Sequence, residues 1–370
     1  MIGIITLPPH ANYGGIIQAW SMQQVLNKLG FESELILPSP YRRINVFQKI
    51  YLYPIRAFKK LILKKHEIIR KERIHNLVYS LSLKNTSKLR SFTDENIKIR
   101  RVNNLDDVKE TDYEAIVIGS DQIWRPQYSY WFDSKVANSF GWFARKWNNV
   151  KILSYSASFG ISSLKEFSKA DKKRASKMLK RFSGVAVREK DGIDLCAQLG
   201  ANAFHVLDPT MLIEKCEYEK LIPQDTPARN GIMTYILDPT YETDNLINHF
   251  KSIINKDIFS PLSKTSNEVN PLSHWLAGFR DADLIITDSF HACVFSIIFQ
   301  KPFIVIGNPS RGLSRIHSLL STFNLEHHFV ESFKDLKDIS NYTLDINTLT
   351  SKLQCEQNKS LNFFQKSLNN

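Results

Sequence analysis

The chain contains 370 residues, of which 43% are hydrophobic and 11% aromatic, and its formal net charge at pH 7 is +12. This length exceeds what one hydrophobic core usually serves, so we expect two domains of ordinary size. The composition excludes a disordered chain, and no apolar run is long enough to span a bilayer. The four cysteines are widely separated, without a Cys-x-x-Cys pair or matching histidines, so we expect no metal site, reduced thiols and a cytoplasmic protein.

The N-terminal segment 2–7 is apolar and lacks the basic leader of a signal peptide, so it predicts a first strand. The loop 10–15 follows it, and a helical pattern then covers about 16–29. Gly14 and Gly15 let the backbone turn closely, and the N-terminus of the next helix can face an anionic ligand. A glycine-rich turn that binds nothing explains the same loop.

The positive charge is concentrated between Arg42 and Arg101, where 17 lysines and arginines face 4 aspartates and glutamates. Within this segment, 55–75 has apolar residues near helical spacing, and Pro54 suits a first turn. Such a basic amphipathic helix can contact an anionic membrane surface through 42–75. A solvated helix packed on its own domain is the other explanation. Nucleic acid is not expected, because no helix-turn-helix, RNA-binding or zinc pattern accompanies the charge.

Further strands of the first half end in polar side chains. One leads to Ser120 and Asp121, the next ends near Ser156, and a third leads directly to Arg188. Polar groups at the carboxyl ends of strands are where open α/β sheets bind ligands. Strands and helices alternate throughout, which predicts a doubly wound α/β sheet.

A second strand-first pattern begins at Ile232, after a charged linker that contains two prolines. We therefore predict an N-terminal α/β domain over 1–215, with a basic helical insertion at 42–101, and a C-terminal α/β domain over 216–345. The last segment, 346–370, is expected to form a helix that packs back on the N-terminal domain. The predicted fold class is α/β, with two Rossmann-like, doubly wound domains that face a cleft.

The segment 282–303 contains an apolar strand, a polar turn and then a helical pattern. Ser289 is placed to cap the first turn of that helix, and His291 falls within this turn. Backbone N–H groups at a helix N-terminus attract anions, and an imidazole can donate or accept a proton near neutral pH. His291 is therefore a candidate catalytic residue, although a polar residue that only satisfies the helix end explains the same pattern.

Several of these stretches, taken together, resemble the polysaccharide pyruvyl transferase family. They are Asn12-Tyr-Gly-Gly with Gln18-Ala, Gly119-Ser-Asp-Gln-Ile-Trp, Ser154-Tyr-Ser-Ala-Ser-Phe-Gly, Val187-Arg-Glu-Lys-Asp, Leu207-Asp-Pro-Thr and Thr287-Asp-Ser-Phe-His. They follow the family's order over most of the chain, and only the basic segment has no counterpart. Some characterised members carry an arginine between the serine and the histidine, where this chain has Phe290, which leaves one fewer cation for the donor.

The resemblance implies a GT-B arrangement and transfer of the pyruvyl group of phosphoenolpyruvate onto two hydroxyls of a sugar. The product is a cyclic ketal in an exopolysaccharide or capsule precursor, with phosphate released and no bound cofactor. Arg188 and Arg315 would then bind the donor. His291 would transfer a proton, and Asp288 or Asp121 would orient it or deprotonate the hydroxyl. The other implied substrate contacts are Ser289, Asn12, Tyr13, Gly14, Gly15, Gln18, Ser120, Gln122, Ser156 and Asn308.

Two other functions suit the same pattern. One is a GT-B glycosyltransferase that uses a nucleotide sugar, since fold does not determine function. The other is a non-catalytic binding protein of a polysaccharide locus. The alternative for Arg188 is a surface ion pair with Glu189 or Asp191. If the acceptor sugar is carried on a polyprenyl diphosphate, the basic segment would hold the enzyme at the inner face of the membrane.

Overall fold

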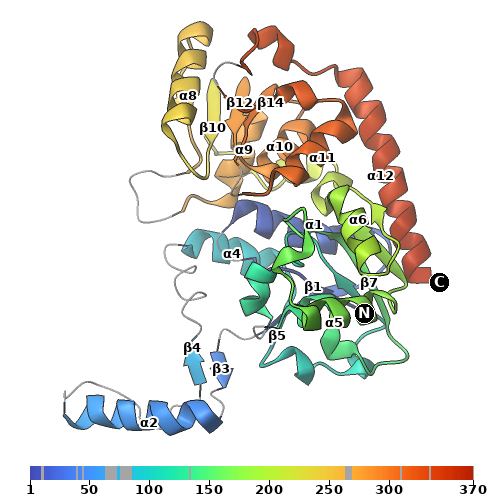
Figure 1. Ribbon diagram of the computed structural model, residues 1–370. Helices are drawn as coiled ribbons and strands as arrows, with labels where there is room; N and C mark the ends of the chain where they lie inside the picture. Colours follow the sequence, from blue (N-terminus) through green and yellow to red (C-terminus); the bar gives the residue numbers. More distant parts are fainter. Residues whose placement is uncertain are drawn as a thin grey trace.

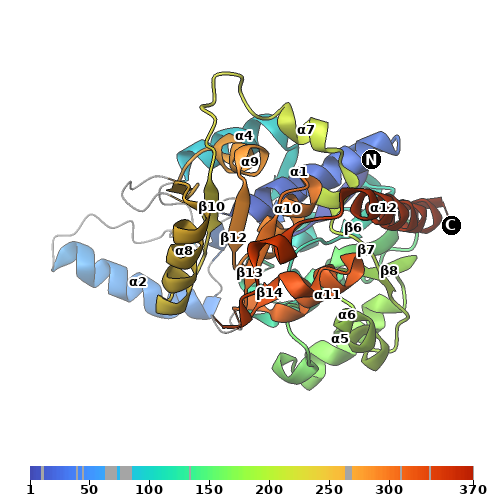
Figure 2. The ribbon, with the colours of Figure 1, turned by 90° about the horizontal axis from the view of Figure 1, so that it is seen from above.

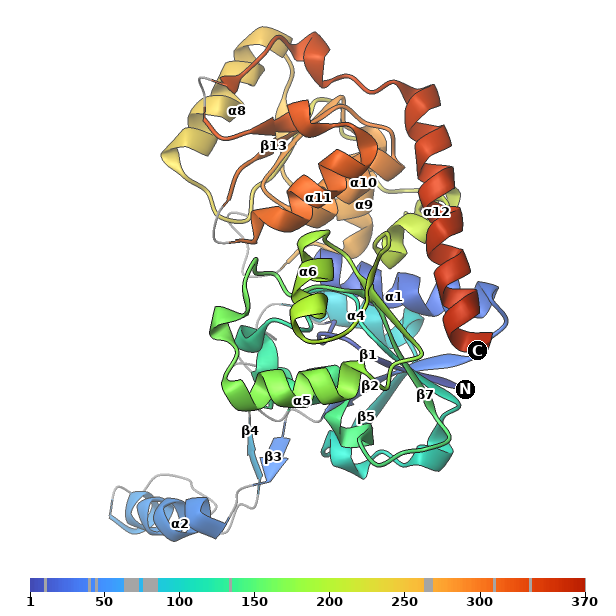
Figure 3. The same ribbon diagram turned by 45° about the vertical axis from the view of Figure 1, so that its right-hand side comes forward.

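The computed structural model describes residues 1–9, 12–38, 41–43, 46–62, 73–75, 86–132, 135–262, 269–308, 311–332 and 335–369. Two domains, each built on a parallel β-sheet with helices packed around it, are stacked one above the other (Figure 1). The turned view in Figure 3 shows the long C-terminal helix running along the side of both domains.

The N-terminal sheet has seven parallel strands in the order β5-β2-β1-β6-β7-β8-β9. Their bounds are Ile2–Ile5 (β1), Ser33–Pro38 (β2), Ile99–Val102 (β5), Ala115–Ile118 (β6), Lys151–Ala157 (β7), Gly184–Val187 (β8) and Phe204–His205 (β9). The central strands β1 and β6 are fully buried, as expected for strands covered by helices on both faces. The helices of this domain are α1 (Tyr13–Lys28), α4 (Ser87–Asn96), α5 (Lys169–Leu179) and α6 (Asp191–Gln198).

The C-terminal sheet has five parallel strands in the order β11-β10-β12-β13-β14. Their bounds are Ile232–Tyr235 (β10), Ile258–Phe259 (β11), Leu284–Thr287 (β12), Phe303–Ile306 (β13) and Phe329–Val330 (β14). The helices are α8 (Tyr241–Ile254), α9 (Leu272–Asp281), α10 (Phe290–Ile298) and α11 (Leu313–Phe323), and α7 (Lys215–Glu219) lies in the connection between the sheets. Every residue of α10 is buried, which explains its almost wholly apolar sequence.

Short 3-10 helices occupy many of the connections. They are Leu105–Asp107, Glu110–Asp112, Pro126–Trp131, Val136–Phe140, Trp142–Ala144, Leu164–Glu166, Pro209–Leu212, Glu326–His328 and Ile339–Tyr342.

The two domains share one large hydrophobic core. It contains Ile4 of the N-terminal sheet and Ile285 of the C-terminal sheet. Tyr13 of α1 stacks on Trp275 of α9 with ring centroids 5.6 Å apart. Seen from above, α9 and α10 lie over α4 and α1 (Figure 2). This contact positions the carboxyl ends of the two sheets relative to each other.

The C-terminal helix α12 (Ile346–Asn369) packs on β7 and β8 of the N-terminal sheet. Phe364 stacks on Tyr155 at a centroid distance of 3.9 Å, and Lys151 Nζ donates a hydrogen bond to the Leu368 carbonyl at 2.6 Å. The last helix therefore connects the C-terminal domain back to the first sheet.

The basic segment differs from the expected single helix over 55–75. Its helix α2 runs from Val46 to Leu61 and has Pro54 inside it, whereas the antiparallel pair β3 (Tyr41–Arg43) and β4 (Arg73–His75) forms its base. The helical spacing of apolar residues extends upstream of the proline, so Pro54 is not a first-turn residue. The expected helical residues 63–72 lie outside the described part of the chain. The expected insertion 42–101 also includes α4 and most of β5, an edge strand of the sheet.

Within the described ranges, none of the helices combines the length and the apolar character that a bilayer crossing needs. Among the same residues, no group of three or more His, Cys, Asp or Glu side chains is arranged to hold a metal ion.

Candidate active site

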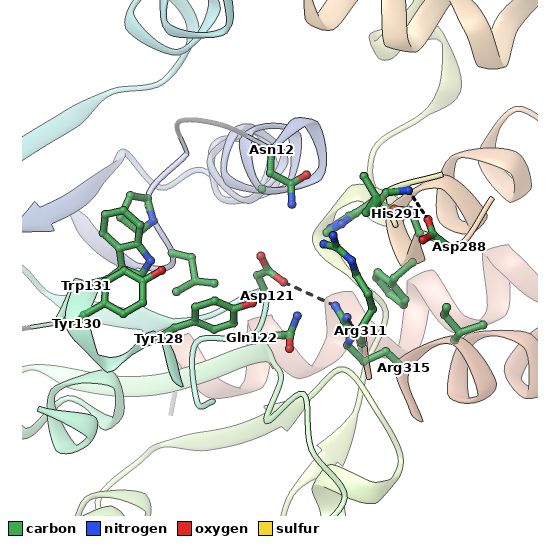
Figure 4. A pocket seen from close by; sticks show the side chains of 17 residues that line it. Asn12, Asp121, Gln122, Tyr128, Tyr130, Trp131, Asp288, His291, Arg311 and Arg315 are labelled. Atoms are coloured by element: carbon green, nitrogen blue, oxygen red, sulfur yellow. Dashed lines mark hydrogen bonds and ion pairs between the residues drawn. The ribbon is translucent and has the colours of Figure 1, made fainter. Parts of the chain in front are cut away.

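A cavity with a volume of about 230 Å³ lies between the two domains (Figure 4). The chain order reverses between β1 and β6 in one sheet and between β10 and β12 in the other. The segments that follow these four strands all line the cavity, with Pro8, Asn12, Asp121, Gln122, Leu237 and Asp288 among the lining residues. Open α/β sheets bind ligands at such reversal points, so the cavity lies where the fold predicts a substrate site.

His291 projects from the first turn of α10 towards α1 of the other domain. A Cβ atom at Gly14 would lie 2.2 Å from His291 Nδ1, so only glycine leaves room for the imidazole. Nε2 of His291 is buried and has no hydrogen-bond partner among the described residues. Burial lowers the pKa of His291, although the charges of Asp208 and Asp121 oppose this effect. The lowered pKa favours the neutral imidazole over the imidazolium.

Asp208, which was not among the expected site residues, approaches the imidazole, whereas we expected Asp288 or Asp121 to orient it or to deprotonate the hydroxyl. Asp208 Oδ2 lies 3.9 Å from His291 Nε2. Asp288 accepts hydrogen bonds from Leu237 N at 2.8 Å and from Asn308 Nδ2 at 3.0 Å. Asp288 therefore joins the loops after β10 and β13. Asp208 and Asp288 both follow strands, and the packing of the two sheets brings Asp208 to the histidine.

Arg188 is buried between two carboxylates. Its Nη1 lies 3.1 Å from Asp208 Oδ2, its Nη2 lies 3.1 Å from Asp121 Oδ1, and its side chain is 1% exposed. It is thus no surface partner of Glu189 or Asp191, and it lies behind the residues that line the cavity. Burial is the largest single influence on Asp121 and would raise its pKa, but the charges of Arg188, His291 and Arg315, with the hydrogen bond from Arg188, together lower the pKa. Asp121 consequently faces the cavity as a carboxylate.

Two arginines of the C-terminal domain line the cavity, and the second, Arg311, was not among the expected site residues. Arg315 Nη1 lies 3.9 Å from Asp121 Oδ1, and its buried Nε has no hydrogen-bond partner in the described structure. Burial and the nearby charge of Arg188 lower the pKa of Arg315 to about 10. Arg311 forms two hydrogen bonds with Asp238, at 2.6 and 2.8 Å. In the cavity lining, the guanidinium of Arg311 is therefore paired with a carboxylate, and that of Arg315 is poorly compensated.

Phe290, which stands where some family members have an arginine, lies beside both buried guanidinium groups. The guanidinium carbon of Arg188 is 4.5 Å from the centroid of its ring, and that of Arg315 is 5.6 Å away. The electron-rich ring face stabilises these cations. At this position the chain thus supports two existing cations instead of adding a third.

An aromatic wall, formed by Tyr128, Tyr130 and Trp131, closes the N-terminal side of the cavity (Figure 4). The rings of Tyr130 and Trp131 lie with centroids 4.8 Å apart, and those of Tyr128 and Tyr130 with centroids 6.4 Å apart. We did not expect these residues in the site. The signal that could have revealed them is the aromatic run that begins at Tyr128, a few residues after the polar turn that contains Asp121.

The remaining expected contacts divide into two groups. Asn12, Gly15, Gln122 and Ser289 line the cavity. Tyr13, Gln18, Ser120 and Ser156 are buried behind its wall. The hydroxyl of Tyr13 donates to the Asn270 carbonyl at 2.8 Å, and Ser120 Oγ donates to Gln18 Oε1 at 3.0 Å. The Oγ atom of Ser156 is buried without a hydrogen-bond partner among the described residues.

Local structure at the two helix starts explains part of this division. The Asn12 side chain accepts a hydrogen bond from Gly14 N at 3.0 Å and caps α1, so the helix begins at Tyr13, earlier than the expected start near residue 16. The first helical turn therefore directs Tyr13 into the core. Ser289 occupies the corresponding position before α10 but makes no side-chain cap hydrogen bond.

The chain is similar to several solved structures of other proteins. A protein assigned as a UDP-N-acetylglucosamine 2-epimerase of Listeria monocytogenes has a TM-score of 0.51 and 8% sequence identity, covering 98% of this chain and 90% of that one. A glycosyltransferase of Rickettsia africae ESF-5 has a TM-score of 0.47 and 13% identity, covering 100% and 99%. The kitacinnamycin glycotransferase has a TM-score of 0.49 and 9% identity, covering 99% and 98%. With the two parallel sheets, the likeness to the Listeria protein shows the expected GT-B arrangement of two Rossmann-like domains.

The sequence itself matches one family over most of its length. The family described as polysaccharide pyruvyl transferase matches residues 12–310, a range that contains Asp121, Arg188 and His291. No curated protein matches the chain. The chain belongs to the polysaccharide pyruvyl transferase family, and the protein is a transferase.

Proposed function

We propose that this enzyme transfers the pyruvyl group of phosphoenolpyruvate onto two hydroxyls of a sugar in a polysaccharide precursor and releases phosphate. One observation carries the proposal: the buried Arg315 guanidinium and the buried His291 imidazole both line the cavity, and each has a ring or guanidine nitrogen without a partner among the described residues. A buried, poorly compensated cation and a buried imidazole in the lining of one cavity suit a small anionic substrate.

The donor has the charge that this site lacks. Phosphoenolpyruvate carries a carboxylate and a phosphate, together about −2.5 to −3. Arg315 and Arg311 are the cations that line the cavity, and the N-terminus of α10 adds partial positive charge. In this proposal Arg188, which the family resemblance implied as a donor contact, instead holds Asp121 and Asp208 in place. It acts as a positioning residue.

The reaction needs one group that gives a proton and one that accepts a proton. Protonation of the methylene carbon by His291 turns it into a methyl group and leaves an oxocarbenium-like carbon. Two sugar oxygens bond to that carbon, and the bond from it to the phosphate oxygen breaks. One hydroxyl proton replaces the proton that His291 gave, and the other leaves with the phosphate. Substrates and products balance without any change in oxidation state, so the proposal includes no redox cofactor.

Two features support these roles. Burial lowers the pKa of His291, and a bound trianion would raise it, because a nearby negative charge favours the imidazolium. Asp121 lines the cavity and stays ionised, so it can accept a proton from the acceptor hydroxyl. The acid and the base therefore come from different domains.

The aromatic wall supports an acceptor site on the N-terminal side. Aromatic rings offer apolar surface for the faces of a sugar ring, and the hydroxyl groups of Tyr128 and Tyr130 add polar contacts. A sugar carried on a polyprenyl diphosphate is the acceptor that we place here, with its linkage unspecified.

Isothermal titration and a phosphate-release assay test the proposal. The protein should bind phosphoenolpyruvate, not uridine or guanosine diphosphate sugars, and should release phosphate only when a sugar acceptor is supplied. Binding of a nucleotide sugar without binding of phosphoenolpyruvate would identify a glycosyltransferase instead. Binding of a saccharide with no turnover of either donor would identify a non-catalytic binding protein.

A further inference from the structure

Helix α2 has a continuous apolar face that is exposed to solvent. The exposed side chains are Phe47 (79%), Ile50 (66%), Tyr51 (52%), Ile55 (47%), Phe58 (53%) and Leu61 (72%), and Ile62 (65%) follows directly after the helix. At 100° per residue these positions fall within about 140° of the helix circumference. Single exposed apolar residues are ordinary, but a whole helix face of them marks an interaction surface. We call this face the α2 stripe.

The opposite side of the same helix is basic. Lys49, Arg56 and Lys60 are about half a turn from the centre of the α2 stripe; Lys60 is exposed, Lys49 is half-buried and Arg56 is buried. The helix contains no aspartate or glutamate, and the segment from Arg42 to Arg101 has 17 basic against 4 acidic residues. An apolar face with a basic opposite face is the pattern of a helix that lies in the interface of a membrane.

The position of α2 leaves this face accessible. The β3–β4 pair carries the helix away from both sheets, and Figures 1 and 3 show it below the N-terminal domain. In these views the two domains are packed against each other without it. The stripe therefore has no role in the described core.

We propose that α2 docks on an anionic lipid membrane, with the α2 stripe among the acyl chains and with Lys49 and Lys60 at the headgroups. Charge complementarity favours this occupant. A second copy of the chain would bring the same positive segment against itself, and like charges repel. An anionic bilayer instead offers an apolar interior for the stripe and negatively charged headgroups for the basic residues. Docking does not depend on the pyruvyl transfer chemistry; if both hold, the membrane presents a lipid-carried acceptor to the enzyme.

Vesicle flotation of the full-length protein tests the proposal without using turnover. Wild type should float with vesicles that contain phosphatidylglycerol and should float at least about tenfold less with pure phosphatidylcholine or in high salt. A stripe variant, with Phe47, Ile50, Phe58 and Leu61 all changed to Gln, should lose at least about tenfold of its vesicle partitioning. Glutamine keeps helix propensity, so the change removes the apolar face and leaves the helix.

A matched control removes equally exposed apolar side chains from another helix. Tyr241→Gln with Ile253→Gln changes residues of α8 that are 81% and 54% exposed, and this variant should float like wild type. A further variant, Lys59→Glu with Lys60→Glu, reverses two charges and should weaken binding to anionic vesicles only. Hydrogen exchange on the wild-type protein provides a readout that needs no variant, because the amides of α2 should gain protection when anionic vesicles are added.

Three results would overturn the proposal. Wild type could fail to float, the stripe variant could float as well as wild type, or the α2 amides could exchange equally with and without vesicles. Sedimentation velocity adds a fourth, since a wild-type dimer that the stripe variant dissociates, with no flotation, would identify a second copy as the occupant. Each of these results leaves the proposed transferase function untouched, because that function is tested by donor binding.

Discussion

The imidazole of His291 lies so close to Gly14 that a Cβ atom there would be 2.2 Å from Nδ1. The contact joins the first turns of α10 and α1 and therefore couples the position of the imidazole to the packing of the two domains. Alanine normally stabilises a helix interior by up to about 1 kcal/mol relative to glycine. At this position the added methyl group must instead push the imidazole away.

We therefore expect Gly14→Ala to lower kcat by about 100-fold or more, because a displacement of about 1 Å is enough for such a loss. Steady-state kinetics measure it. Gly15→Ala is the matched control for folding, since its Cβ would meet nothing closer than Asn12 Cβ at 3.9 Å, and its thermal midpoint should equal or exceed that of wild type. Wild-type turnover by Gly14→Ala would show that His291 need not occupy this position.

Removal of the charge should affect stability at Arg188 and donor binding at Arg315. Arg188→Met leaves Asp121 and Asp208 buried without their shared cation, so the free energy of unfolding should fall by about 3–5 kcal/mol. Burial lowers the pKa of Arg315, so this cation is not favoured by its surroundings. In Arg315→Met the free energy of unfolding should therefore change by less than about 1 kcal/mol. Its donor affinity should instead fall by about tenfold to 100-fold.

Urea unfolding and calorimetric titration with phosphoenolpyruvate measure the two effects. If Arg188→Met were as stable as wild type and still failed to bind the donor, Arg188 would contact the donor directly, as the family resemblance implied.

Donor binding should be accompanied by uptake of a proton at His291. The pKa of this residue is lowered by burial in the empty site, and a bound trianion raises it, so donor affinity should increase as the pH falls from about 8 to about 6. Calorimetry in buffers of different ionisation enthalpy measures the uptake. His291→Gln should take up fewer protons than wild type, and equal uptake by both proteins would exclude a change of protonation at this imidazole.

Tyr128 should contribute to acceptor binding and not to donor binding. Tyr128→Ala removes an aromatic face from the cavity wall and should raise the acceptor KM by about tenfold, with the affinity for phosphoenolpyruvate unchanged. Tyr128→Phe keeps the ring and should behave much more like wild type. An unchanged acceptor KM in Tyr128→Ala would place the sugar elsewhere in the cavity.

His328 should make the fold sensitive to acid. The residue is fully buried, its Nδ1 lies 2.7 Å from the Phe303 carbonyl oxygen, and burial lowers its pKa to about 4. Below its ordinary pKa of about 6.5, the unfolded chain binds a proton here that the folded chain does not. The free energy of unfolding should therefore be insensitive to His328 above about pH 6.5. It should fall by up to about 3 kcal/mol as the pH drops towards 4. In urea unfolding at several pH values, His328→Gln should show a flatter dependence, and an equally steep one would contradict this assignment.

Much of the architecture could be predicted because it depends on local pattern. Short apolar runs such as Ala115–Ile118 and Leu284–Thr287 are strands buried on both faces, and the alternation with helices indicates parallel sheets. The start of α10 beside His291 also followed from a polar turn after a strand. The bounds of α2 did not, because Pro54 is tolerated inside a helix that extends upstream of it.

The amino-acid sequence by itself determined which strands end in polar groups and that a histidine begins the helix after one of them. Only the tertiary structure decided that Asp208 approaches His291, that Arg188 is enclosed by two carboxylates, and that Arg315 faces the cavity. These relationships join residues that are far apart along the chain. Their physical cause is the packing of two sheets through a shared core, which local periodicity does not encode.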